Sequence, residues 1–215
     1  MVVKKLVVCL LTAAAIFAQR STTSRYTVIG WNDLGMHCVD GKDYSVYSIL
    51  PPYNTFHAQV LNSGKLVKST SGITLSYSAI ADPAGSINKS SIGKTNFWEY
   101  SKPLYGAQLA PDMGLAGFPM PGAANPFVRM KFDTVYRWFT GEGVPIMPYD
   151  DAGRKNYYPM MRLTARDSSG RTLASTDIVL PVSDEMDCKA CHASGSVGTS
   201  RPNAGWAFLS DPEKD

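Results

Sequence analysis

The chain has 215 residues and a formal net charge of +3, with 44% hydrophobic, 11% aromatic and 18% charged residues. This composition is typical of a folded globular protein and excludes a disordered, collagen-like or coiled-coil chain. The length suits one domain with a small appendage, and a charge this small without a basic run argues against nucleic-acid binding.

The first 18 residues have the organisation of a secretory signal peptide. Lys4 and Lys5 precede the apolar run 6–17, and the small residue Ala18 follows. The run is shorter than the roughly 20 residues of a membrane-spanning helix, although an N-terminal anchor or a buried helix is the alternative interpretation. We predict cleavage after Ala18, no transmembrane span after cleavage, and a periplasmic or extracellular location, where thiols tend to pair or to bind a ligand.

Strand patterns follow in the first half of the mature chain. They cover residues 25–31, 44–49, 55–61, 65–69 and 73–80. The turn-forming residues 62–64 predict a hairpin between the third and fourth of these segments. On the strand 55–61, alternation predicts one face with Thr55, His57, Gln59 and Leu61, and another with Phe56, Ala58 and Val60.

The second half begins with a long segment, 81–125, that is rich in Gly, Pro and aromatic residues. We predict it to be irregular and to cover one sheet or to line a cofactor. Strand patterns resume at 127–132, 134–139, 158–166 and 171–180, the last two joined by a turn at 167–170. No helix is predicted except a short one near the C-terminus.

Short strands separated by Gly, Pro and Ser turns predict a mainly β fold, an antiparallel sandwich of immunoglobulin-like style. We place this domain at residues 25–181 and a short helical segment at 182–215.

The cysteines carry the clearest chemical signal. Outside the leader, which holds Cys9, only Cys38, Cys188 and Cys191 remain, an odd number that cannot all pair internally. Residues 188–192 read Cys-Lys-Ala-Cys-His, the attachment pattern of c-type haem. Cysteines at i and i+3 of a helix lie on one face, so both sulfurs can reach one edge of a porphyrin, and His192 can lie beneath the iron. A disulfide, a zinc half-site and a redox Cys-x-x-Cys are the alternatives.

On residues 188–192 and the leader, the chain resembles the c-type cytochromes. The resemblance implies covalent haem c made outside the cytoplasm, with Cys188 and Cys191 as anchors, His192 as proximal iron ligand, and electron transfer as the role. It covers little of the chain. Small soluble cytochromes c have the motif near their start, whereas only 23 residues follow His192 here, without His or Met.

The sixth iron ligand must therefore come from upstream, from a missing C-terminal region or another subunit, or be absent. His37 is the first candidate, because it lies beside Met36 and Cys38 in a turn-rich stretch where ligands are often presented. His57 is the second candidate, although a packed structural histidine is the plainer interpretation. Further candidates are Met113, Met120, Met147, Met160 and Met161, most of which we expect to be core residues.

These observations favour an exported haem c protein that transfers single electrons to or from a redox partner protein, rather than a catalyst. Two other functions remain open. One is a five-coordinate haem enzyme or a sensor of a small ligand. The other is a secreted binding module without haem, with Cys188 and Cys191 in a disulfide and His37, Cys38 and His57 on copper or zinc.

Overall fold

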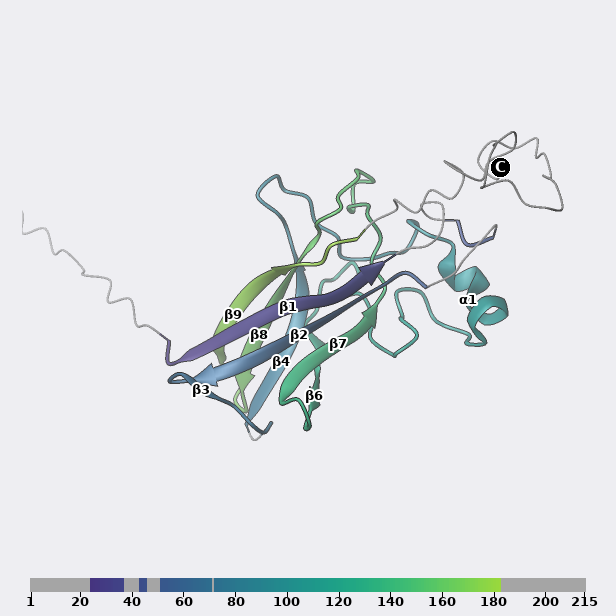
Figure 1. Ribbon diagram of the computed structural model, residues 1–215. Helices are drawn as coiled ribbons and strands as arrows, with labels where there is room; N and C mark the ends of the chain where they lie inside the picture. The colour runs from purple at the N-terminus through teal and green to yellow at the C-terminus, as the bar shows by residue number, and fades with distance from the viewer. Residues whose placement is uncertain (1–23, 37–42, 46–50, 71, 183–215) are drawn as a thin grey trace, which may run out of the picture.

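The structure is a computed structural model that describes residues 24–36, 43–45, 51–70 and 72–182. It contains nine strands and one helix in these residues, arranged as two antiparallel sheets (Figure 1). Their bounds are β1 Tyr26–Met36, β2 Tyr53–Asn62, β3 Lys65–Leu66, β4 Ile73–Ile80, α1 Phe97–Tyr105, β5 Val128–Arg129, β6 Lys131–Asp133, β7 Trp138–Val144, β8 Met160–Asp167 and β9 Thr172–Val179. The prediction of a mainly β, antiparallel fold is confirmed.

The first sheet has the strand order β1-β2-β7-β6, and β3 also pairs with β2. The second sheet has the order β5-β4-β8-β9. Met130 lies between β5 and β6 and donates its N–H to Leu75 O at 2.9 Å, so the segment predicted as one strand at 127–132 passes from the second sheet to the first.

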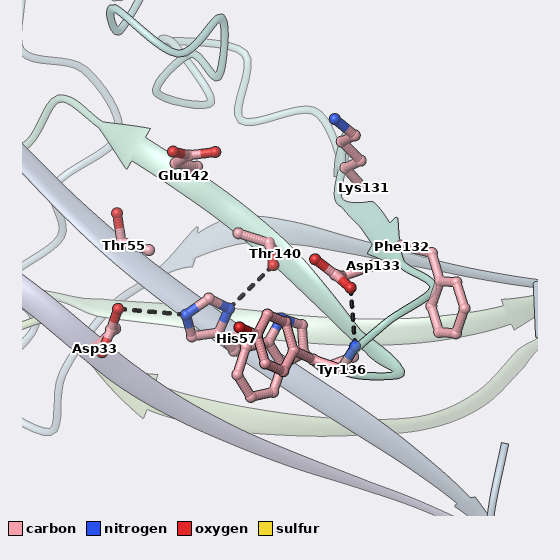
Figure 2. A pocket seen from close by; sticks show the side chains of 10 residues that line it. Asp33, Thr55, His57, Lys131, Phe132, Asp133, Tyr136, Thr140 and Glu142 are labelled. Atoms are coloured by element: carbon pink, nitrogen blue, oxygen red, sulfur yellow. Dashed lines mark hydrogen bonds and ion pairs between the residues drawn. The ribbon is translucent and has the colours of Figure 1, made fainter. Parts of the chain in front are cut away.

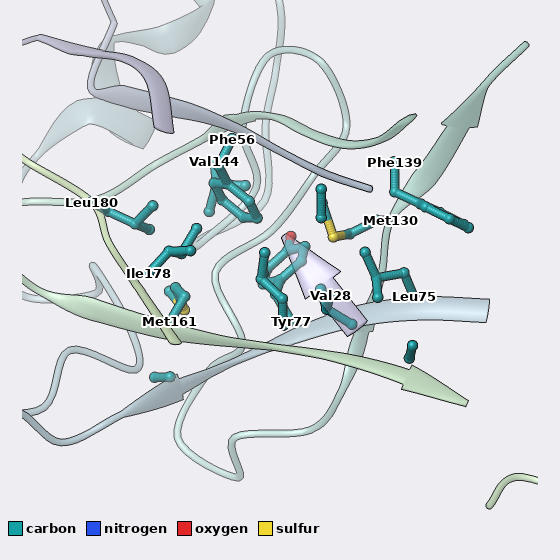
Figure 3. Close-up of a cluster of buried hydrophobic side chains, with 14 of the residues drawn as sticks. Val28, Phe56, Leu75, Tyr77, Met130, Phe139, Val144, Met161, Ile178 and Leu180 are labelled. Atoms are coloured by element: carbon teal, nitrogen blue, oxygen red, sulfur yellow. The ribbon is translucent and has the colours of Figure 1, made fainter. Parts of the chain in front are cut away.

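One hydrophobic core is shared by the two sheets. Phe56, Ala58 and Val60 of β2 are buried in one cluster with residues of β4 and β8 such as Tyr77 and Leu163. Figure 3 shows Phe56 and Tyr77 in this core. The Phe56 and Tyr77 rings meet edge to face, with centroids 5.1 Å apart. Gly30 lies where the sheets approach closely, because a Cβ atom there would be 2.6 Å from Leu163 Cδ1. We call the face of each sheet that lines this core its inner face, and the opposite face its outer face.

Both predicted hairpins are present. Ser63 and Gly64 have φ of 49° and 77°, the left-handed pair that a two-residue hairpin turn requires. Between β8 and β9, Asp167 Oδ1 accepts N–H bonds from Ser169 and Arg171, and Gly170 has a φ of 83°. Local turn chemistry therefore sets the register at both places.

Three strand predictions are wrong in part. Tyr44 and Ser45, predicted in a strand, lie in a turn in which Asp43 Oδ1 accepts the Ser45 N–H. Residues 134–137 also form a turn, because Asp133 Oδ1 accepts the N–H groups of Val135 and Tyr136, and β7 begins only at Trp138. The strand predicted at 65–69 is shortened to the two residues of β3.

The prediction of an irregular segment at 81–125 missed α1. Pro103 lies inside this helix, and aromatic side chains are common in it, which is why the sequence pattern did not suggest a helix. Tertiary packing explains its presence, because Phe97 is buried against Tyr44 with ring centroids 5.3 Å apart. Gly106, in the left-handed conformation, ends the helix. The short helix predicted at 182–215 lies outside the described residues, except for its first residue, Val182.

Candidate functional site

The candidate site lies on the outer face of the first sheet. Strand register brings four side chains into one row, since Trp31 of β1 is opposite His57 of β2, His57 is opposite Thr140 of β7, and Thr140 is opposite Lys131 of β6. Because side chains alternate along a strand, His57 faces away from the core that Phe56 and Ala58 fill. The two faces predicted for residues 55–61 are thus confirmed for these positions.

His57 is held from several directions. It is 7% exposed, and its Nδ1 is 3.0 Å from Thr140 Oγ1. Its Nε2 is 3.5 Å from Asp33 Oδ2. The register of β1 against β2 shifts between Asn32 and Leu34, so Asp33 is the extra residue of a bulge. A bulge re-aims a side chain, and here the Asp33 carboxylate lies next to the histidine (Figure 2).

Aromatic rings form a column beside His57. The Trp138 ring lies 4.6 Å from the His57 ring at 34°, and Tyr136 stacks on Trp138 at 4.6 Å and 17°. Trp31 meets Trp138 edge to face at 5.5 Å. Tyr136 is 61% exposed, because it belongs to the β6–β7 turn. The column therefore runs from a buried histidine to an exposed phenol.

These residues line a pocket of about 360 Å³, which we call the His57 pocket. Figure 2 shows Asp33, Glu142 and Asp133 around it, with Lys131 at one side. Its lining also includes Thr55, Phe132, Tyr136, Trp138 and Thr140. Thr55 Oγ1 accepts the Gly143 N–H at 3.0 Å, which ties β2 to β7 at the pocket edge. A concave site with aromatic walls and a few polar groups is the usual form of a small-molecule site.

A second hollow of about 320 Å³ adjoins this pocket and shares Thr55 and Glu142 with it. Its lining is mostly apolar and includes Pro51, Pro52, Tyr53 and Leu115. It lies at the start of β2, near the place where the described chain ends, because Asn54 Nδ2 donates to Pro181 O at 2.9 Å.

Of the histidines and cysteines predicted to bind the haem or its iron, only His57 is described. Cys188, Cys191 and His192 lie outside the described residues, as do His37 and Cys38. Three of the methionine candidates are buried, as expected for core residues: Met120, Met147 and Met161.

The sequence analysis missed most of the His57 pocket. Its other members come from the bulge on β1, from β6 and the turn after it, and from β7, which was predicted to end at residue 139 but continues to Val144. With the strand continued to Val144, alternation would have placed Trp138, Thr140 and Glu142 on one face. Asp33 had no comparable signal, because a bulge leaves no period in the sequence.

In the part of the chain that the structure describes, no group of three or more His, Cys, Asp or Glu side chains is arranged to hold a metal ion. None of the described helices is long and apolar enough to cross a membrane. No family model, curated protein or solved structure matches the chain.

Proposed function

We propose that this chain is an exported c-type cytochrome that transfers single electrons through a covalently attached haem c. The observation that carries the proposal is the Cys-x-x-Cys-His sequence at 188–192, in a chain whose first 18 residues have the pattern of a secretory leader and which has few other cysteines. Cys188 and Cys191 would hold the haem through thioethers, and His192 would be the proximal iron ligand. The haem supplies the reversible one-electron chemistry, and the protein positions and insulates it.

Chain connectivity supports a haem close to the sheets. Pro181 is fixed to Asn54 by a hydrogen bond of 2.9 Å, and Val182, the last described residue, is buried. Cys188 lies six positions after Val182, so their Cα atoms are at most about 22 Å apart. The attachment point is therefore tethered to the end of the fold where β2 begins.

The first candidate for the sixth ligand is tethered to the same end. His37 directly follows Met36, whose partner across the sheet is Tyr53, the neighbour of Asn54. His57 is less available, since Thr140 faces one of its ring nitrogens and Asp33 faces the other. Iron ligation by His57 would require Nε2 to leave Asp33. These observations favour His37 over His57.

The apolar hollow beside Pro51, Pro52, Tyr53 and Leu115 offers a surface against which an edge of the haem could pack. An apolar environment excludes water and raises the reduction potential of an iron centre. We further propose that the two sheets form an immunoglobulin-like sandwich at 25–181 and that 182–215 form a short helical haem segment. The location would be periplasmic or extracellular, and the partner a redox protein.

The test is an optical spectrum of the chain expressed with a cytochrome c maturation system. The proposal predicts sharp α and β bands on reduction, and haem that stays with the protein after denaturation and acid–acetone extraction. His37→Ala should then convert the iron to a high-spin form, whereas His57→Ala should leave a six-coordinate spectrum. The reverse result would make His57 the ligand.

Two other outcomes would replace the proposal. Covalent haem that is high-spin in the parent chain and shifts with carbon monoxide would indicate a five-coordinate enzyme or sensor. A chain without covalent haem would be a secreted binding module, a function that the His57 pocket also suits.

A further inference from the structure

The His57 pocket has features that electron transfer does not use. Its carboxylates outnumber its cations, since Asp33, Asp133 and Glu142 face a single ammonium group, that of Lys131. The Asp33 side chain is 63% exposed. The carboxylate of Glu142 and the ammonium of Lys131 make no hydrogen bond or ion pair with any other described residue. The Glu142 carboxylate is thus fully available to a ligand. Asp33 also faces His57 Nε2 at 3.5 Å, and Asp133 Oδ1 accepts two backbone N–H groups of the β6–β7 turn.

The aromatic column gives the pocket a second attraction for cations. The faces of indole and phenol rings carry negative charge density, which attracts ammonium groups within about 6 Å of the ring centre. Tyr136 is held against Trp138 by stacking at 4.6 Å, so its ring is already ordered although it is 61% exposed. A ligand that uses this ring therefore loses little conformational entropy in fixing it.

We propose that the His57 pocket binds an alkylammonium cation, with Glu142 and Asp33 as counter-charges and Tyr136 as an aromatic contact. The volume of about 360 Å³ fits a small organic cation, and it lies in the range of ordinary ligand sites. The ammonium group could belong to a free amine or to a lysine side chain of a basic peptide. This site is independent of the haem and goes beyond the proposed electron-transfer function.

Charge also favours an organic cation over two other possible occupants of the pocket, the C-terminal segment and a metal ion. The segment 183–215 carries six acidic and three basic residues, so an acidic pocket would repel it. A bare metal ion does not fit either, because the described residues include no metal-binding group of three or more His, Cys, Asp or Glu. An organic cation needs only diffuse negative charge and ring faces, which this pocket provides.

The test is isothermal titration of the full exported chain with choline, and with 3,3-dimethyl-1-butanol, its neutral isostere. We expect choline to bind about tenfold more tightly, since only choline gains from the carboxylates, and to weaken as salt is raised. N-acetyl-lysine methylamide tests the peptide source. If that compound binds and choline does not, the alkylammonium group that occupies the pocket is a lysine side chain.

Matched variants locate the site. Glu142→Gln should weaken choline binding about two- to fivefold, the effect of one exposed ion pair, and Tyr136→Ala should weaken it to a similar degree. Glu99→Gln is the control, because Glu99 is an exposed acid on α1, outside the pocket. Thermal unfolding should be unchanged in Glu142→Gln and Glu99→Gln, since both side chains are exposed. Tyr136→Ala should unfold at a slightly lower temperature, because it loses the ring stack on Trp138.

Three results would overturn the proposal. They are that none of the cations binds, that choline and its isostere bind equally tightly, or that Glu142→Gln and Glu99→Gln weaken choline binding equally. Preference for a methyl glycoside over every cation would assign the aromatic column to carbohydrate instead. None of these results depends on whether the chain carries haem, which the optical spectrum decides separately.

Discussion

The two faces of the first sheet are built from the same strands but have different properties. On β2, Phe56 and Ala58 are fully buried in the core shared with the second sheet. On the other face of the same strand, Thr55 and His57 line a pocket together with charged residues. One face holds the fold together through apolar contact area, and the other arranges polar groups that contribute little to that core.

This difference shows where mutations should separate stability from binding. Apolar burial contributes most of the folding free energy, so substitutions on the inner face should be costly. Exposed polar groups contribute little, so the outer faces are free to carry charges and rings selected for recognition. The following variants test this division, from the largest expected effect to the smallest.

Phe56→Ala should lower the free energy of unfolding by about 3–5 kcal/mol, the cost of a large cavity in a packed core. The reason is that Phe56 is fully buried and meets Tyr77 edge to face. Chemical denaturation measures the change. Gln59→Ala, on the outer face of the same strand, is the control and should change stability by less than about 0.5 kcal/mol. Similar effects of the two variants would contradict the division between the faces.

Gly141→Ala should lower the free energy of unfolding by about 1–3 kcal/mol through overpacking. A Cβ atom at this position would be 2.7 Å from two atoms of the Phe56 ring. If that contact is the cause, the same substitution should cost less when Phe56 is replaced by Leu, and a double-mutant cycle measures the coupling. Additive effects of the two substitutions would assign the cost to another contact.

Thr140→Val should lower the free energy of unfolding by about 0.5–1.5 kcal/mol, because it removes the hydroxyl 3.0 Å from His57 Nδ1 while keeping the shape of the side chain. Thr74→Val on β4 is the matched control, since Thr74 has no side-chain hydrogen bond to another described residue. Urea titrations should give a lower free energy of unfolding for Thr140→Val than for Thr74→Val. Equal stability would mean that the hydrogen bond to His57 contributes nothing.

Asp177→Asn should have the smallest effect, about 0.2–1 kcal/mol at neutral pH, as for an exposed ion pair. Asp177 is held by Arg162 through N–O contacts of 2.7 and 2.8 Å on the outer face of the second sheet. This hydrogen-bonded guanidinium lowers the pKa of the Asp177 carboxyl. The stabilisation is therefore complete above the unfolded pKa of about 4 and is lost as the pH falls through the lower folded pKa.

Stability curves of the parent and Asp177→Asn at pH 6 and pH 2 check this sign. The difference between the two chains should be larger at pH 6 and shrink toward pH 2. A difference that does not depend on pH would show that the carboxylate charge is not what Arg162 stabilises.

The sequence predicted the fold where local signals and burial agreed. The strands 73–80 and 158–166, the hairpin turns and the two faces of β2 were all readable from alternation and turn residues. The errors arose where side-chain bonds or tertiary packing decided the outcome. Asp133 turned a β-like segment into a hairpin turn, and packing of Phe97 on Tyr44 stabilised a helix that contains Pro103.

The haem motif and the His57 pocket also differ in how far the sequence could predict them. The haem motif is a local pattern, so five consecutive residues were sufficient to predict it. The His57 pocket joins β1, β2, β6 and β7, and its members become neighbours only through sheet register and the bulge at Asp33. A single sequence contains His57 and Glu142 but gives no sign that they line one pocket.

The measurement that tests the central claim most directly is the intact mass of the protein, made with a cytochrome c maturation system and denatured before analysis. The account predicts a chain cleaved after Ala18 that is heavier than its polypeptide by one haem, and a Cys188→Ser, Cys191→Ser variant that lacks this added mass. A parent chain with the mass of the bare polypeptide would contradict the assignment as a c-type cytochrome.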